Sequence, residues 1–160
     1  MIPRHFLYAT MLAITSLACS SSFAAEPSSV ALAMVKKLRL GDNLPSMGYQ
    51  AATTTQTYRI IVQSVGPEKA RTLITDELNR ARPKYQDRWD KNLAASYSES
   101  FSEEELQSIA DRQKASPYIN KFLAKQGEVG NSMQAKSTEL LDSFVTEVVS
   151  GAFNKVVPKK

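Results

Sequence analysis

The sequence predicts an all-α protein: a single-domain bundle of about five to seven helices that ends in a long amphipathic helix. Apolar residues recur at helical spacing through most of the chain, whereas valine, isoleucine and threonine never form the alternating runs of roughly four to eight residues that are typical of strands. The 6 glycines and 7 prolines of the 160 residues stand where breaks between helices are expected.

Residues 1–24 have the pattern of an export signal. After a short basic start, residues 6–18 form an apolar run that is too short to span a bilayer, and small residues precede a predicted cut after Ala24. The alternative is a lipoprotein signal that keeps Cys19 as its lipid-bearing first residue. Ser16 stands where such a signal has a large aliphatic residue, so cleavage after Ala24 is the prediction.

Export places the protein in the periplasm. Release from the cell, or attachment to the outer membrane through Cys19, are the alternatives. Cleavage after Ala24 removes the chain's one histidine, His5, and its one cysteine. The domain at 25–160 then lacks the residues of Cys or His zinc sites and of most nucleophile–base pairs. We therefore predict no metal, no cofactor and no catalytic residue.

Charge and hydropathy limit the partners further. The net charge of +4 comes from interspersed acids and bases, whereas a nucleic-acid partner would need a basic stripe. We predict no nucleic-acid partner. After the signal, no run approaches the roughly 20 apolar residues of a transmembrane helix, so no integral membrane segment is predicted.

Three helices are expected in the first half of the domain. The first covers Val30–Leu40, and Asp42–Gly48 is expected to be a loop because Pro45 interrupts it. A second helix is predicted over Tyr49–Val65. A third begins at Pro67, a favoured first helical residue, and runs to about Ala81.

A fourth helix is expected after Pro83, which should break or kink the chain. Its apolar residues recur every four positions and so share one face. This stripe consists of Tyr85, Trp89, Leu93 and Tyr97. Such a stripe is usually core; the alternative is the wall of an apolar pocket, to which Met34 and Met47 would add adaptable surface.

The next boundary is the best specified one in the chain. Ser102 is followed three residues later by Glu105, the pattern of a capping box. Ser116 and Pro117 should restart a short helix, which ends near Gly127.

A last helix is predicted after Gly130–Asn131. Its apolar face is sustained for roughly twenty residues, so it is either the central helix of the domain or an exposed surface for a partner. The candidate interaction surface consists of Phe144, Val148, Phe153 and Val156.

The segment from Phe101 to Val129 carries a recognisable pattern. It consists of Phe101–Ser102, Glu105–Leu106, Ser116–Pro117 and the run Lys121–Gln126. This pattern resembles the bacterial domain-of-unknown-function 2059 family, whose members are exported, all-helical and without established activity. The resemblance implies the fold and the compartment, and it carries over no catalytic residue.

Four functions remain open from the sequence. The first is a non-catalytic interaction module that binds another envelope protein or itself. The second is a carrier of an apolar ligand or lipid, and the third is a secreted factor that acts on a host or a neighbouring cell. The fourth is a hydrolase built on carboxylates, for which Glu99 and Glu105 are the candidates because they flank aromatic residues.

Overall fold

The structure, a computed structural model, describes residues 28–156. Within this range the chain forms helices and turns and no strand, so the all-α prediction is confirmed. The predicted signal, including His5, Cys19 and the cut after Ala24, lies outside the described residues. The elements are, in chain order, α1 (Ser29–Lys37), the 3-10 helix η1 (Leu40–Asn43), α2 (Leu44–Thr54), α3 (Gln56–Val65), α4 (Pro67–Ser100), α5 (Glu103–Arg112), the 3-10 helix η2 (Gln113–Ala115), α6 (Ile119–Ala124) and α7 (Gln126–Val156).

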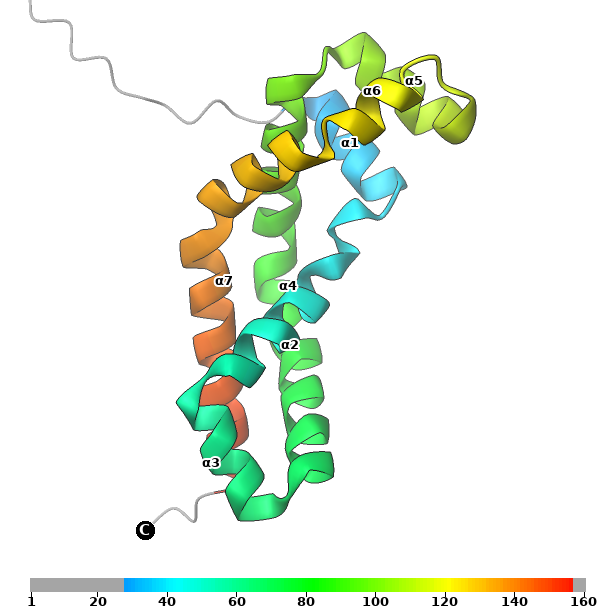
Figure 1. Cartoon of the computed structure of the whole chain (residues 1–160). Helices are drawn as coiled ribbons and strands as arrows, with labels where there is room; N and C mark the ends of the chain where they lie inside the picture. Colours follow the sequence, from blue (N-terminus) through cyan, green and yellow to red (C-terminus); the bar gives the residue numbers. More distant parts are fainter. Residues whose placement is uncertain (1–27, 157–160) are drawn as a thin grey trace, which may run out of the picture.

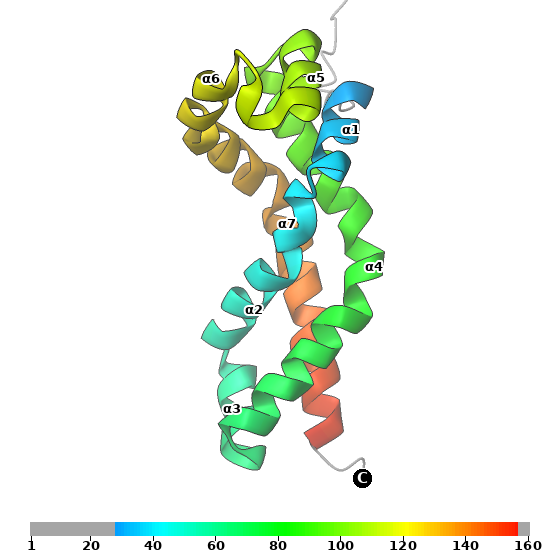
Figure 2. The ribbon, with the colours of Figure 1, turned by 90° about the vertical axis from the view of Figure 1, so that its right-hand side faces the viewer.

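The long helices α4 and α7 form the axis of an elongated molecule and pack along each other (Figure 1). The predicted long C-terminal helix is confirmed, because α7 has 31 residues. Near the C-terminal end of α7, α2 and α3 pack on both long helices, and Figure 2 shows them on one side of the pair. Near the other end, α1 packs on α4 and α5, while α6 joins the start of α7.

The core runs the length of this arrangement, and its largest fully buried apolar side chains come from six helices. They are Phe144, Met34, Leu44, Ile61, Ile74, Leu106, Ile109, Val35 and Val148. Each of these elements is amphipathic, and burial of such faces supplies most of the stability of a helical bundle.

Of the two outcomes predicted at Pro83, the break is wrong, because α4 continues through it. A proline inside a helix removes one backbone hydrogen bond and costs about 3 kcal/mol. Pro83 and Asn79, whose carbonyl loses its partner, are both exposed, so water can hydrate the freed group. Packing of α4 against α7 on both sides of this point outweighs the remaining cost.

The predicted loop at Asp42–Gly48 is also wrong. Pro45 lies in the first turn of α2, where a missing N–H group removes no helical hydrogen bond. The helix before it ends at Lys37, earlier than predicted, because Arg39 adopts the left-handed conformation with a φ of 55°.

Two further boundaries differ from the prediction. The segment Tyr49–Val65 is divided at Thr55, whose hydroxyl accepts a hydrogen bond from the Tyr58 N–H group at 3.1 Å and caps α3. The last helix starts at Gln126, before the predicted Gly130–Asn131 boundary, because both residues fit inside α7. At Thr55 a local cap ends a helix that the pattern predicted to continue, whereas at Gly130 the packing of α7 outweighs the local signal for a turn.

The capping box at Ser102 is confirmed. The Ser102 hydroxyl accepts from the Glu105 N–H group at 3.3 Å, and the Glu105 carboxylate accepts from the Ser102 N–H group at 2.9 Å.

Gly48 sets how closely α2 approaches the long helices. A Cβ atom at this position would lie 2.5 Å from a Phe144 ring carbon and 2.8 Å from a Leu78 methyl carbon. Both neighbours are buried in the core, where side chains are close-packed and can shift little. A larger residue would push α2 away from the α4–α7 interface.

We expect Gly48→Ala to lower the free energy of unfolding by about 1–3 kcal/mol, the usual cost of overpacking. Gly130→Ala is the matched control, since no atom lies within 4 Å of a Cβ there. Inside α7 this control should raise the free energy of unfolding by about 0.5–1 kcal/mol. Urea unfolding followed by circular dichroism measures both; equal effects of the two changes would contradict this packing.

Candidate functional site

An apolar groove of about 690 Å³ lies beside the α4–α7 interface. It is bounded by the C-terminal half of α4, the N-terminal half of α7 and the corner where η1 meets α2. The apolar lining residues are Leu40, Met47, Trp89, Leu93, Tyr97, Val129, Met133 and Leu141. The volume falls within the roughly 300–1,000 Å³ of small-molecule sites.

The α4 wall contains most of the predicted aromatic stripe. Trp89, Leu93 and Tyr97 line the groove, but Tyr85 does not. The Tyr85 ring packs on Phe144 at a centroid distance of 5.1 Å, and its hydroxyl donates to Glu147 at 2.9 Å. The stripe is thus largely buried and also presents part of its surface to the groove.

The two methionines expected at the pocket behave differently. Met47 lines the groove and is 38% exposed, whereas Met34 is fully buried in the core. A second lining methionine, Met133, faces the groove from α7. The groove therefore has a flexible thioether side chain on two of its walls.

Trp89 connects α4 to the third wall. Its indole N–H group donates to the Asn43 side-chain oxygen at 3.0 Å, which satisfies the polar end of an otherwise buried ring. Asn43 belongs to η1, so this bond holds η1 against α4 at the edge of the groove.

Aromatic packing closes the end of the groove near α6. The Tyr97 ring stacks on Phe122 at 5.5 Å and lies tilted against Phe101 at 6.1 Å. Its hydroxyl donates to Gln126 at 3.3 Å. Burial raises the pKa of Tyr97, so the phenol stays protonated and serves as a donor.

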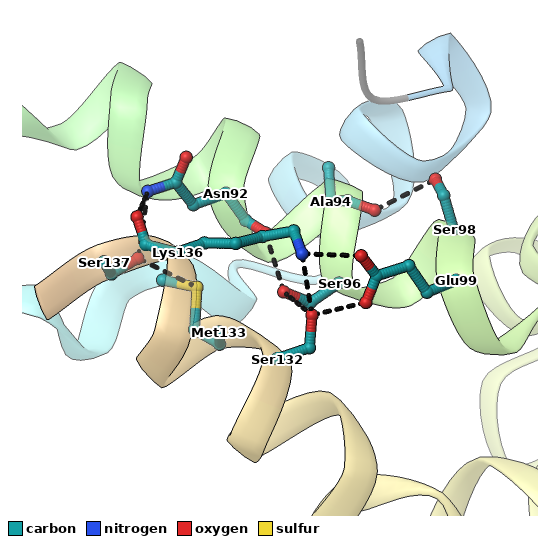
Figure 3. Close-up of polar contacts among 9 residues, drawn as sticks. All are labelled: Asn92, Ala94, Ser96, Ser98, Glu99, Ser132, Met133, Lys136 and Ser137. Atoms are coloured by element: carbon teal, nitrogen blue, oxygen red, sulfur yellow. Dashed lines mark hydrogen bonds and ion pairs between the residues drawn. The ribbon is translucent and has the colours of Figure 1, made fainter. Parts of the chain in front are cut away.

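A polar cluster fixes the α4–α7 interface next to the groove (Figure 3). Asn92 donates to the Lys136 carbonyl at 2.9 Å and to the Ser137 hydroxyl at 3.0 Å. Ser137 in turn donates to the Met133 sulfur at 3.4 Å. These contacts set the rotation of α7 that directs Met133 into the groove.

The same cluster brings a serine, a lysine and a carboxylate together. Lys136 Nζ lies 3.1 Å from Ser132 Oγ and 2.5 Å from a Glu99 oxygen, while Ser132 donates to the other Glu99 oxygen at 2.5 Å. A serine–lysine hydrolase needs the lysine to accept the serine proton. Here the lysine donates to Glu99, and the shortest contact of the serine hydroxyl is to the same carboxylate, which suits a structural cluster.

The carboxylates proposed for a hydrolase lack the environment of a general acid. Hydrogen bonds from Lys136 and Ser132 hold the pKa of Glu99 below its ordinary value. Hydrogen bonds from Lys121 and Ser102 do the same for Glu105. A glycosidase acid needs a raised pKa instead.

The structure corrects the predicted interaction surface. Phe144 and Val148 are fully buried, because α2, α3 and α4 cover this part of α7. Phe153 and Val156 are only half-buried and pack against the core. These four residues therefore do not form one surface open to a partner.

Sequence reasoning missed the α7 wall. Val129, Met133, Ser137 and Leu141 recur every four residues, the same spacing as the stripe on α4. The matching period on two long helices is a signal that could have paired them. The cluster of Glu99, Ser132 and Lys136 joins residues distant in sequence and has no comparable signal.

The fold and the groove define the class: an all-α protein with an elongated apolar groove between long helices. No family model, no curated protein and no solved structure matches the chain. The resemblance to the domain-of-unknown-function 2059 family therefore stays a prediction.

Among residues 28–156, no three histidine, cysteine or acidic side chains are grouped to hold a metal. No helix of the same range is long and apolar enough to span a membrane.

Two buried carboxylates with opposite pKa shifts lie on α4. Asp90 packs under the η1 backbone, where a Cβ on Gly41 would overlap its carboxylate, and it accepts a hydrogen bond from Gln86 at 2.8 Å. Burial raises the pKa of Asp90. Burial also acts to raise the pKa of Glu77, but hydrogen bonds from Lys155 and Arg80, each 2.7 Å long, lower it overall.

We expect Asp90→Asn to raise the free energy of unfolding at pH 7. Because the pKa of Asp90 is raised by folding, its ionisation opposes folding above that pKa, and the amide removes this cost. The gain should shrink as the pH falls through the folded-state pKa, since Asp90 is then protonated in the wild type.

Glu77→Gln is the control of opposite sign. A lowered pKa means that ionised Glu77 stabilises the fold above the ordinary glutamate pKa of about 4.3, and that this stabilisation is lost in acid. The free energy of unfolding of this variant should be about 2 kcal/mol lower than that of the wild type at pH 7, the scale of hydrogen bonds to a charged group. Thermal unfolding of both variants between pH 7 and pH 3 measures these changes. Destabilisation of the protein by Asp90→Asn at pH 7 would refute the raised pKa of Asp90.

Proposed function

We propose that the protein is a non-catalytic carrier that binds a single-chain amphiphile, with the apolar chain in the groove between α4, α7 and the η1–α2 corner. The observation that carries this proposal is the lining of the groove. Eight of its residues are apolar or aromatic, and they come from three sides. Apolar walls with a few polar groups at the edge are typical of small-ligand sites.

The shape of the groove favours an extended chain over a compact molecule. On α4 the lining residues run from Trp89 to Tyr97, and on α7 from Gln126 to Asp142. At 1.5 Å per residue, these stretches correspond to about 12 Å and about 24 Å of helix. A long, narrow ligand can contact both walls along this length.

The lining combines rigid and adaptable surfaces. Trp89 and Tyr97 are held by hydrogen bonds to Asn43 and Gln126, so they present fixed ring surfaces. Met133 and the exposed Met47 can change rotamer to follow a ligand. This combination suits a class of related chains rather than one rigid molecule.

Protein interaction and self-association are less well supported than they were from sequence. Both depended on an uncovered face of α7, and Phe144 and Val148 are inside the core. The exposed large apolar residues of the described range, Met47, Ile60 and Leu123, lie on three different helices.

Export remains part of the proposal. An exported carrier would meet amphiphiles of the cell envelope. The predicted signal supports this location, with a mature chain that begins at Ala25 or, in the lipoprotein alternative, at a lipid-bearing Cys19. The mass of the chain recovered from the envelope distinguishes the two.

We expect dodecyl maltoside, below its critical micelle concentration, to change the fluorescence of the purified protein in a saturable way. The chain has 1 tryptophan, Trp89, and this residue lines the groove. Gln134→Phe should weaken binding at least about tenfold, a loss of about 1.4 kcal/mol, because the new ring occupies the groove.

Ala135→Phe is the matched control. It adds the same ring to an exposed position of α7 that does not line the groove, so affinity should stay at the wild-type level. Circular dichroism verifies that both variants are folded. A folded wild-type protein with no saturable signal, or equal weakening by both variants, would refute the proposed function.

A further inference from the structure

The edge of the groove carries an unbalanced negative charge. Asp142 is the one charged residue among those that line the groove, and no lysine or arginine lines it. The Asp142 side chain is exposed and takes part in no ion pair within residues 28–156. An acid at the edge of an apolar site favours a cation there and repels an anion.

Other acids near the α4–α7 interface differ from Asp142. Glu99 is paired with Lys136 at 2.5 Å, and Glu147 is paired with Lys84 at 2.7 Å. Their charges are neutralised within the fold. Among the described residues that line the groove, Asp142 is therefore the charge available to a bound molecule.

Most other polar groups of the lining already have partners within the protein. The Asn43 oxygen accepts from Trp89, and the Gln126 amide bonds to Tyr97 and to the Phe122 carbonyl. Thr138 donates to a carbonyl of its own helix at 2.8 Å. A polar head group consequently finds its strongest unused partner at Asp142.

The position of Asp142 fits a ligand with its head at one end. Asp142 follows Leu141 at the last lining turn of α7, whereas Tyr97 and Gln126 close the opposite end of the groove. Met133 lies about 13 Å from Asp142 along the helix axis. A chain that starts beside Asp142 would pass Leu141 and Met133 on its way to Tyr97.

We propose that the groove selects amphiphiles with a positively charged head group, which binds beside Asp142, over amphiphiles of equal chain length with an anionic head group. This inference rests on the proposed function, because it adds a head-group preference to the binding of a chain. It runs against the net charge of +4, which by itself attracts anions. A preference for cations must therefore come from the groove.

The test compares dodecyltrimethylammonium, dodecyl maltoside and dodecanoate, all below their critical micelle concentrations, by the fluorescence of Trp89. We expect the cation to bind most tightly and dodecanoate most weakly, with about a two- to fivefold difference between them at low salt, the scale of one exposed charge pair. The difference should narrow at high salt because the charges are screened.

Charge substitutions assign the preference to one side chain. Asp142→Asn should remove the preference, and Asp142→Lys should reverse it. Asp76→Asn removes a negative charge from an exposed residue of α4 that does not line the groove, so it should leave the preference unchanged. Circular dichroism verifies the fold of each variant.

The outcomes separate the two proposals. If none of the three compounds binds, the proposed function fails and the head-group preference fails with it. If all bind equally, or dodecanoate binds most tightly, the chain-binding function stands and the cation preference is wrong. A preference that persists in Asp142→Asn would also overturn the role of Asp142.

Discussion

The packing of α4 along α7 is the constraint on which the rest of the structure depends. These helices are the longest elements. The helices α1, α2, α3 and α6 pack on one or both of them, and α5 packs on α1. Near the C-terminal end of α7, α2 and α3 cover the pair and bury Phe144 and Val148. Near the other end, α1 and η1 pack on α4, while the start of α7 leans away from them (Figure 2). The groove lies where α2 and α3 cease to cover the α4–α7 pair. Its position therefore depends on where the shorter helices pack along the two long ones.

Polar contacts give the α4–α7 interface its register at the groove. Asn92 and Ser96 on α4 meet Ser132, Lys136 and Ser137 on α7 (Figure 3). Satisfied polar groups between helices favour one alignment, because any other alignment would leave buried groups without partners. In this alignment Trp89 and Leu93 lie across the groove from the α7 wall. The cluster therefore shapes the groove without lining most of it.

Sequence patterns predicted the elements of the fold better than their boundaries, and the errors share a physical cause. The capping box at Ser102 was found because both of its hydrogen bonds are local. Pro83 and Pro45 were misjudged because the effect of a proline depends on whether its helix is supported and on its place in the first turn. The α4 side of the groove was predictable from Trp89 and its neighbours. The α7 side, and the place of Asp142 at the edge of the groove, depend on helix pairing, which no local pattern specifies.

Nuclear Overhauser effects between a bound dodecyl chain and methionine methyl groups test the central claim most directly. Met47 and Met133 line the groove from two of its walls, and Met34 is buried elsewhere in the core. With dodecyltrimethylammonium and methyl-labelled methionine, we predict contacts from chain protons to Met47 and Met133 and none to Met34. Contacts to neither groove methionine in a protein saturated with ligand would contradict the account.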